Sequence, residues 1–386
     1  MNPAIVVVGY NRPDTLKRLL KSIENANYSD NNIELIISLD KAVNEDEVVK
    51  VSNDFNWRYG KKIIRRFPER QGLRKHIIQC GDLAEKYGAV IILEDDLLVA
   101  PDYYEYVKAA LDYYKDEECI TGIALYSHEW NGYARKNFVP MADQYDTYLG
   151  QYSITWGQCW TFKWWNKFKK WYFSHEDKLI ENPNIPMNIN HWSDNSWGKY
   201  FVNYIVEQDK YYVIPRISRS TNCSDVGEHV RIADNVHQVR MMTGLVESYK
   251  FAPVQKAQKY DIYFESINIK DVYKEEIKNS LTVDLAGYGR EEKETRYLLT
   301  TNILPLKIIK SYGLQLRPYE MNIIYNFSGN SIYLYDKFTK NHSQMKKKQD
   351  VMRYEIRGFS IRDLIPYIAF LLKESIFSKI KRKMKK

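Results

Sequence analysis

Short apolar runs alternate with helical patterns along the first part of the chain. The runs Ala4 to Val8, Ile33 to Leu39 and Ala89 to Leu93 are rich in β-branched residues, which is typical of strands buried on both faces. Between the first two runs, apolar residues recur at helical spacing: Leu16, Leu19, Leu20 and Ile23. This β-α-β-α order predicts an α/β fold, with a mainly parallel, Rossmann-like sheet sandwiched between helices and right-handed crossovers.

Other segments continue the alternation. The pattern predicts a short strand near Ile63 and helices at four places: from about Asp14, at Glu45 to Phe55, at His76 to Tyr87, and after Pro101. Beyond residue 240 the alternation fades. The aromatic and β-branched runs Tyr260 to Phe264 and Ser331 to Tyr335 predict small strands. We therefore expect an α/β domain at 1–240, an accessory α+β region at 241–345 and a tail at 346–386.

The tail pattern allows two interpretations. Apolar residues run from Phe359 to Ile380, are interrupted at Pro366, and lead into a basic cluster. An amphipathic helix flanked by lysines is typical of a peripheral membrane anchor. The alternative is a helix docked on the protein body, followed by a solvated basic end.

The charge distribution favours the membrane interpretation. The formal net charge is +8, but six of the basic residues stand at the end of the chain, which leaves +2 for the rest: Lys379, Lys381, Arg382, Lys383, Lys385 and Lys386. Neither a basic face nor a recognisable nucleic-acid module is evident, so a nucleic-acid partner is not expected. A terminal basic cluster suits an anionic membrane surface, because each Lys or Arg near it contributes about 1 kcal/mol.

The four cysteines, Cys80, Cys119, Cys159 and Cys223, show neither C-x-x-C pairing nor nearby histidines at ligand spacing. This argues against a zinc site or a disulfide framework. No signal-peptide pattern and no uncharged run of about 20 apolar residues is present. We therefore expect a cytoplasmic protein, peripheral on the inner face of the plasma membrane.

The acidic triplet Glu94-Asp95-Asp96 follows the Ala89 to Leu93 run directly. It therefore lies at the carboxyl end of a predicted parallel strand, where open α/β sheets bind their ligands. Three adjacent carboxylates repel one another unless a cation or a hydrogen-bonded ligand compensates, which indicates a divalent metal bound with a phosphate-bearing substrate. The alternative is a solvated acidic turn before the helix at Pro101.

Trp156 and Trp160 flank Gly157 in a predicted loop. Their indoles are suited to pack against the apolar faces of sugar rings. By contrast, Trp164, Trp165 and Trp171 fit one helical face and are expected in the core.

Six segments in order resemble the GT-A glycosyltransferases, and most closely the N-acetylglucosaminyltransferase I family. The resemblance covers about residues 4 to 230. Its segments are Val7 to Arg12, Ile37 to Asp40, Leu93 to Leu97, Val99 to Tyr106, Trp192 to Asp194 and Ile214 to Arg219.

The resemblance implies a division of roles on the donor side. Asp96 would ligate Mn²⁺ or Mg²⁺ bridging the donor diphosphate, and Glu94 and Asp95 would contact ribose or sugar hydroxyls. Asp40 would accept hydrogen bonds from the uracil or ribose, and Arg12 would lie near the nucleotide. The resemblance also implies that Arg74 approaches the diphosphate. For both Arg12 and Arg74, the alternative is a salt bridge on the protein surface.

On the acceptor side, Asp194 corresponds to the family's general base. An inverting transfer needs one carboxylate to take the acceptor hydroxyl's proton. The family carries an acidic residue before this base, whereas Ser193 stands here. Asp194 could instead cap the following helix. His229 is a candidate second metal or phosphate ligand, against a purely structural histidine.

Together these features predict a metal-dependent inverting glycosyltransferase that uses a UDP-sugar, with UDP-GlcNAc as one candidate. The acceptor would be a glycan or a lipid-linked glycan in bacterial surface polysaccharide synthesis. Two alternatives stay open: a sugar nucleotidyltransferase, although Gly9 to Arg12 lacks the Gly-rich G-x-G-x-R loop, and a non-catalytic glycan-binding or assembly protein. A processive synthase is disfavoured, because transmembrane helices and a Q-x-x-R-W motif are absent.

Overall fold

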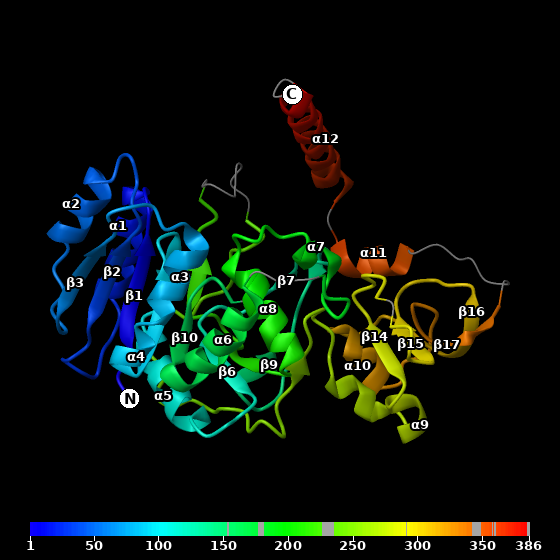
Figure 1. Ribbon diagram of the computed structural model, residues 1–386. Coiled ribbons are helices and arrows are strands. Elements are labelled where there is room, and N and C mark those ends of the chain that lie inside the picture. Colours follow the sequence, from blue (N-terminus) through cyan, green and yellow to red (C-terminus); the bar gives the residue numbers. More distant parts are fainter. Residues whose placement is uncertain are drawn as a thin grey trace.

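The computed structural model describes residues 1–383 except 153, 177–180, 226–234, 291, 342–348, 357 and 359. A nine-stranded sheet forms the larger part of the molecule, in the order β13-β9-β11-β6-β10-β4-β1-β2-β3 (Figure 1). Its strands are β1 (Ala4–Gly9), β2 (Leu35–Leu39), β3 (Lys62–Arg66), β4 (Ala89–Glu94), β6 (Ile120–Ala124), β9 (Thr147–Gly150), β10 (Gln158–Thr161), β11 (Tyr211–Pro215) and β13 (Lys259–Tyr260). Five of its eight pairings are parallel, including the block β4-β1-β2-β3.

Helices cover both faces of this sheet. They are α1 (Pro13–Glu24), α2 (Asp46–Asp54), α3 (Leu73–Gly81), α4 (Ala84–Tyr87), α5 (Tyr103–Tyr114), α6 (Phe162–His175), α7 (Met187–Asn190) and α8 (Trp197–Glu207). Side chains of β1 alternate between two cores: Ile5 and Val7 pack with α1, α2 and α5, whereas Val6 and Val8 pack with α3, α6 and α8. The predicted mixed α/β class with a mainly parallel, helix-covered sheet is confirmed.

The strand register brings three loops to one edge. β1, β2 and β4 are parallel neighbours, with Gly9 opposite Leu39 and Val8 opposite Glu94. The loops that leave the carboxyl ends of these strands therefore start side by side. Short strands tie the next segment down, because β5 (Leu97–Val99) pairs with β12 (Ser220–Asn222). A separate pair, β7 (Trp130–Asn131) and β8 (Lys136–Asn137), lies outside the large sheet.

A second sheet follows, in the order β14-β15-β17-β16. Its elements are β14 (Leu281–Asp284), β15 (Tyr297–Thr300), β16 (Leu306–Tyr312) and β17 (Ile332–Lys340), with η1 (Asn268–Val272), α9 (Glu275–Lys278) and α10 (Tyr319–Ile324) beside it. This sheet has its own hydrophobic core, which includes Leu299, Ile323 and Leu334. The domain boundaries at 240 and 345 stay predictions. In the structure, β13 belongs to the large sheet, and the first strand of the four-stranded sheet begins at Leu281.

The predicted strand at Tyr260 to Phe264 is wrong beyond its first residue. Only Lys259–Tyr260 pair in the sheet. The Asp261 side chain then accepts hydrogen bonds from the backbone N–H groups of Tyr263 and Glu265, and Phe264 has a φ of 64°. The aspartate side chain therefore closes a turn, which a pattern of apolar residues does not reveal.

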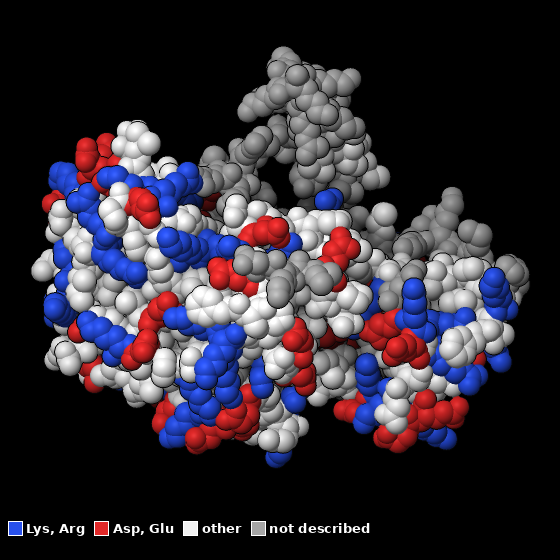
Figure 2. Space-filling model, in the orientation of Figure 1, with Lys and Arg blue, Asp and Glu red and all other residues white. Residues whose placement is uncertain are grey.

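The tail forms two helices, α11 (Gln349–Ile356) and α12 (Ile361–Lys383). Figure 1 shows α12 projecting away from the body, and the apolar side chains described on it are exposed: Ile361, Ile365, Tyr367, Ile368, Phe370, Leu371 and Leu372. Figure 2 shows acidic and basic side chains interspersed over the visible face of the body. Within the described residues, none of the helices combines the length and apolarity needed to span a bilayer.

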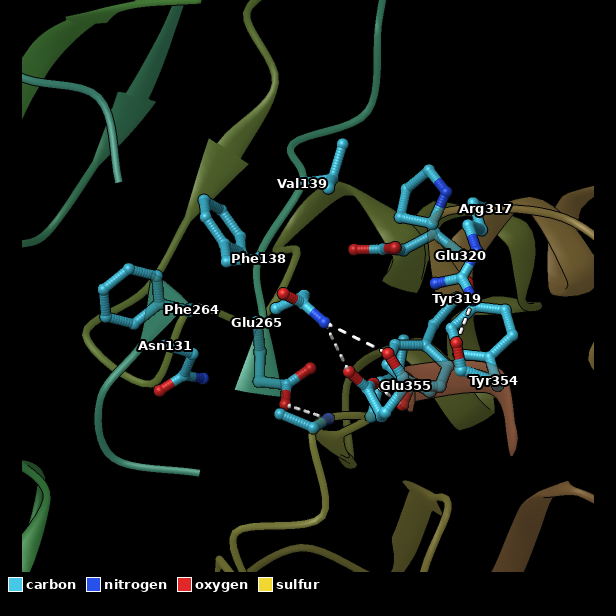
Figure 3. A pocket seen from close by; sticks show the side chains of 14 residues that line it. Asn131, Phe138, Val139, Phe264, Glu265, Arg317, Tyr319, Glu320, Tyr354 and Glu355 are labelled. Atoms are coloured by element: carbon cyan, nitrogen blue, oxygen red, sulfur yellow. Dashed lines mark hydrogen bonds between the residues drawn. The ribbon is translucent and has the colours of Figure 1, made fainter. Parts of the chain in front are cut away.

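Helix α11 docks where the two sheets meet. The rings of Tyr354 and Tyr319 pack in a tilted arrangement with centroids 4.8 Å apart, and Glu355 accepts hydrogen bonds from Tyr319 and from Asn137. These residues border a small cavity of about 50 Å³ that also contains Glu265 and Glu320 from different elements (Figure 3). The first tail helix is therefore fixed to the body.

Candidate active site

The acidic triplet lies at the carboxyl end of β4, beside the loop that follows β1. Asp95 is 3% exposed, and Arg12 donates from its Nη2 to Asp95 and, at 3.1 Å, to Asp96 Oδ2. Arg12 lies between β1 and α1, and β1 is the parallel neighbour of β4. The positive charge beside the triplet therefore comes from the loop that follows β1. Arg12 and the triplet thus come together as predicted residues, and neither the solvated turn nor the surface salt bridge describes them.

One guanidinium does not balance three carboxylates. Burial, followed by repulsion from Asp96 and Asp95, raises the pKa of Glu94 to about 8, and Arg12 opposes that shift. Burial raises the pKa of Asp95 to about 6, with Arg12 opposing and Asp96 adding to the shift. The site therefore favours additional positive charge.

Asp96 offers an oxygen that fits a metal ion. Its Oδ1 is buried and has no hydrogen-bond partner among the residues that the structure describes. No cluster of three His, Cys, Asp or Glu side chains suited to a metal occurs among the described residues. Mg²⁺-type sites commonly use one or two carboxylates and complete their coordination with substrate phosphates and water. The residues fit a cation that arrives with a phosphate-bearing substrate.

Asp40 anchors a loop from a neighbouring segment. Its Oδ1 accepts the backbone N–H of Gln71 at 2.7 Å and of Lys41 at 2.8 Å, and its Oδ2 accepts that of Gly72 at 2.9 Å. Gly72 has a φ of 74°, a conformation that glycine adopts without strain, and α3 begins at the next residue. Asp40 thereby fixes the entry to α3.

Arg74, two residues further on, contacts the loop that contains Asp194. Its Nη1 donates to the Asp194 carbonyl oxygen at 3.0 Å and to the Tyr200 hydroxyl at 2.7 Å. The guanidinium also lies over the Tyr200 ring, 5.1 Å from its centroid. This arrangement differs from the surface salt bridge considered for Arg74. The predicted approach of Arg74 to a diphosphate stays a prediction.

Asp194 presents an exposed carboxylate. Lys199 Nζ lies 2.8 Å from its Oδ1, and the hydrogen bond and charge of Lys199 lower the Asp194 pKa. Helix α8 begins at Trp197 after Ser196, and Asp194 pairs with Lys199 rather than capping backbone N–H groups. The capping interpretation is therefore not what the structure shows.

A cavity of about 940 Å³ connects these two regions. It is lined by residues 70–75, by Thr155 and by five residues around Asp194: Trp192, Ser193, Asn195, Ser196 and Gly198. The loop anchored by Asp40 and the loop that contains Asp194 therefore border one space. No hydrogen bond or ion pair joins Asp194 to the triplet in the described part of the chain, and the triplet residues are not among those that line this cavity.

Several residues near the site escaped the sequence prediction. Arg18 of α1 donates to Asp225, at 3.1 Å from Nη1 to Oδ1, and its Nη2 lies 3.5 Å from the Asp96 carbonyl oxygen. Lys199 pairs with the predicted base. No sequence signal distinguishes Arg18 from the other polar residues of its helix. Lys199, by contrast, follows Asp194 by five residues, and this spacing could have suggested a contact between them across the start of α8.

The tryptophan prediction is partly wrong. Trp164, Trp165 and Trp171 are buried, as expected. Trp160, however, is fully buried and donates its indole N–H to the Tyr212 hydroxyl at 2.8 Å, so it cannot line a sugar pocket. Trp156 is half-buried beside His237, with ring centroids 4.5 Å apart. Trp160 is buried because it belongs to β10, a strand that lies inside the large sheet between β4 and β6.

His229, the candidate second ligand, lies outside the described residues. Its role stays a prediction.

Comparisons with known proteins identify the N-terminal part of the chain. Residues 4–173 match the family model described as "Glycosyl transferase family 2". A curated relative, "Alpha-1,3-mannosyl-glycoprotein 2-beta-N-acetylglucosaminyltransferase" of Arabidopsis thaliana, is 26% identical over 133 residues, covering 31% of this chain and 29% of the relative. The match thus spans less than a third of that relative's length.

Two solved structures are more distant. S. aureus TarS 1-349 in complex with UDP-GlcNAc is 10% identical, with 60% of this chain and 61% of that chain covered and a TM-score of 0.38. GalNAc-T7 with UDP, GalNAc and Mn2+ is 14% identical, with 57% and 44% covered and a TM-score of 0.39. Superpositions this loose carry no weight for function. The family match coincides with the part of the sheet that bears Arg12, Asp40 and the triplet, so residues 4–173 of the chain are similar to glycosyl transferase family 2.

Proposed function

We propose that the protein is a metal-dependent inverting glycosyltransferase that moves a sugar from a UDP-sugar to a glycan or lipid-linked acceptor. UDP-GlcNAc is one candidate donor, and bacterial surface polysaccharide synthesis is the proposed setting. The observation that carries the proposal is the largely buried, under-compensated triplet, in which Asp96 Oδ1 has no partner among the described residues, within the segment that matches the family 2 model. An acidic site of this kind suits a cation-bound diphosphate.

On the donor side, Asp96 would hold Mn²⁺ or Mg²⁺. The cation would stabilise the negative charge that develops on the departing nucleoside diphosphate. Arg12 would remain paired with Asp95 and keep that carboxylate oriented toward donor hydroxyls, with Glu94 beside it. Asp40, already bonded to the loop at Gln71 and Gly72, would position the nucleoside end.

On the acceptor side, Asp194 would act as the general base. It is exposed, and its lowered pKa keeps it ionised at neutral pH. As the acceptor oxygen attacks the anomeric carbon, the bond from that carbon to the diphosphate oxygen breaks, and the hydroxyl proton passes to Asp194. Attack from the face opposite the leaving group inverts the anomeric configuration.

The tail supports an acceptor at a membrane surface. The exposed apolar side chains of α12 and the terminal basic cluster fit peripheral contact with anionic lipid on the cytoplasmic face. A lipid-linked acceptor would be presented at that surface.

A thermal-shift panel of nucleotide sugars, with and without Mn²⁺, tests the donor class. A ligand at about 100 times its Kd stabilises the folded state by about 2.7 kcal/mol, so a UDP-sugar should raise Tm in a Mn²⁺-dependent way. Asp194→Asn should retain that shift, while transfer falls by at least about 100-fold because the base is lost. Wild-type-like turnover by this variant would remove Asp194 from the mechanism.

The same assays separate the alternatives. Release of pyrophosphate from a nucleoside triphosphate would indicate a nucleotidyltransferase. Glycan binding without donor hydrolysis or transfer would indicate a non-catalytic glycan-binding protein.

A further inference from the structure

Resting on the proposed function, we propose that Lys199 and Arg74 are positioning residues that hold Asp194 from two sides for proton removal. Neither residue needs to touch the substrate in this role. Lys199 fixes the carboxylate, and Arg74 fixes the backbone at the same residue.

In the ion pair between Lys199 and Asp194, Lys199 is the buried partner. Its side chain is 10% exposed, against 77% for Asp194. Lys199 Nζ donates to Asp194 Oδ1 at 2.8 Å and to the Trp192 carbonyl oxygen at 3.1 Å. A buried ammonium group requires such acceptors, so breaking the pair would leave an unpaired buried charge. This requirement restricts where the Asp194 carboxylate can lie.

The pair leaves one carboxylate oxygen available. Lys199 engages Oδ1, and the described residues supply no hydrogen-bond donor to Oδ2. A base needs an accessible oxygen to receive a proton, together with a fixed orientation. The ion pair with Lys199 provides the orientation without occupying both oxygens.

Arg74 holds the same residue from the opposite element. Its contacts with the Asp194 carbonyl and with the Tyr200 hydroxyl connect α3 to the start of α8. Tyr200 is itself fixed, because its hydroxyl donates to the Glu176 carbonyl oxygen at 3.1 Å. Asp40 fixes the loop before α3, so the backbone of residues 72–74 links the hydrogen bonds of Asp40 to those that Arg74 makes with the Asp194 loop.

Two charged groups act on the Asp194 carboxylate in the described part of the chain. Lys199 of α8 contributes most, through its hydrogen bond and its charge, and Arg74 of α3 contributes at longer range. Both lower the Asp194 pKa. Removing Lys199 should therefore raise that pKa, so that a higher pH is needed to ionise the base.

The test compares pH profiles of Lys199→Met, Lys199→Arg and wild type. For Lys199→Met, the acid limb of kcat/KM should move up by about one pH unit, and kcat should fall about 10- to 100-fold as the base loses its placement. Donor affinity, measured by calorimetry, should change less than about twofold. Lys199→Arg should restore most of kcat and the position of the acid limb.

A matched control is Lys62→Met. Lys62 Nζ donates to the carbonyl oxygens of Ser52 and Asn53, each at 2.8 Å, away from the site. This variant should lower Tm without moving the acid limb. It thereby separates loss of a partly buried, hydrogen-bonded lysine from loss of the base's partner.

Arg74→Gln provides a second variant that does not depend on Lys199 variants folding. It should lower kcat while donor affinity stays within about twofold. A large loss of donor affinity in Arg74→Gln would instead assign Arg74 to the diphosphate and overturn its positioning role. An unshifted acid limb and unchanged kcat in folded Lys199→Met would overturn the role of Lys199. Absence of transfer by wild type, or full turnover by Asp194→Asn, would show failure of the proposed function itself.

Discussion

At the scale of single residues, the site is organised by unequal charge compensation. Arg12 pairs with Asp95 and Asp96, yet Glu94 and Asp95 keep raised pKa values and Asp96 keeps one unpartnered buried oxygen. Buried charge of one sign is expensive unless a partner neutralises it. The triplet therefore carries more negative charge than Arg12 compensates, which is the basis of the proposed cation site.

Asp96→Asn should remove most of the metal dependence of donor binding. The neutral amide keeps the shape of the side chain but offers weaker coordination to a hard cation. We expect the Mn²⁺-dependent part of the Tm shift with UDP-sugar to disappear, and transfer to fall by at least about 100-fold. Asp112→Asn is the control, because the Asp112 side chain is 77% exposed and pairs with nearby Lys115. A Mn²⁺-dependent shift of wild-type size in Asp96→Asn would contradict the metal assignment.

At the scale of elements, the pattern of apolar residues identified the strands that matter. β1, β2 and β4 lie where their apolar runs predicted, and the triplet is at the carboxyl end of β4. The boundaries of α3 were harder to predict. The helix begins at Leu73 rather than His76, because the entry is set by Gly72 and by side-chain bonds from Asp40, which is distant in sequence.

Helix α12 should bind anionic membranes through its exposed apolar side chains. Replacing Ile365, Ile368 and Leu372 with serine should weaken binding to vesicles that contain anionic lipid by at least about tenfold, since burying each such side chain contributes about 1.5 to 3 kcal/mol when complete. Co-sedimentation measures this change. Phe338→Ser is the control, because Phe338 is 71% exposed on β17 in the accessory sheet. Equal vesicle binding by wild type and the triple variant would contradict a membrane role for α12.

At the scale of the whole molecule, the junction between the two sheets contains buried carboxyl groups. Glu265 is 3% and Glu320 is 6% exposed, and both border the cavity in Figure 3. Burial raises the pKa of Glu320 to about 7. The pKa of Glu265 is raised by burial and by the charge of Asp284. The junction thus favours protonated carboxyl groups, and its stability should depend on pH.

Glu320→Gln should make the protein more stable at alkaline pH. In wild type, unfolded Glu320 releases its proton near its ordinary pKa while the folded group keeps it up to about pH 7, so stability falls as pH rises between these values. Glutamine resembles the protonated acid and removes this loss, which is at most about 3 kcal/mol. Denaturant unfolding at several pH values measures the difference. Glu276→Gln, in exposed α9, is the control, and an identical pH dependence in Glu320→Gln and wild type would contradict the prediction.

The sequence by itself determined the alternation of strands and helices, the position of the acidic triplet and the family 2 resemblance. These are local properties, because burial periodicity and the residues that follow a strand are written in consecutive positions. Only the tertiary structure decided that Trp160 lies in the core, that Arg12 pairs with Asp95 and Asp96, and that Lys199 and Arg74 contact Asp194. Apart from Lys199, these contacts join residues far apart in the chain, and their partners are selected by strand order and packing, which a single sequence does not display.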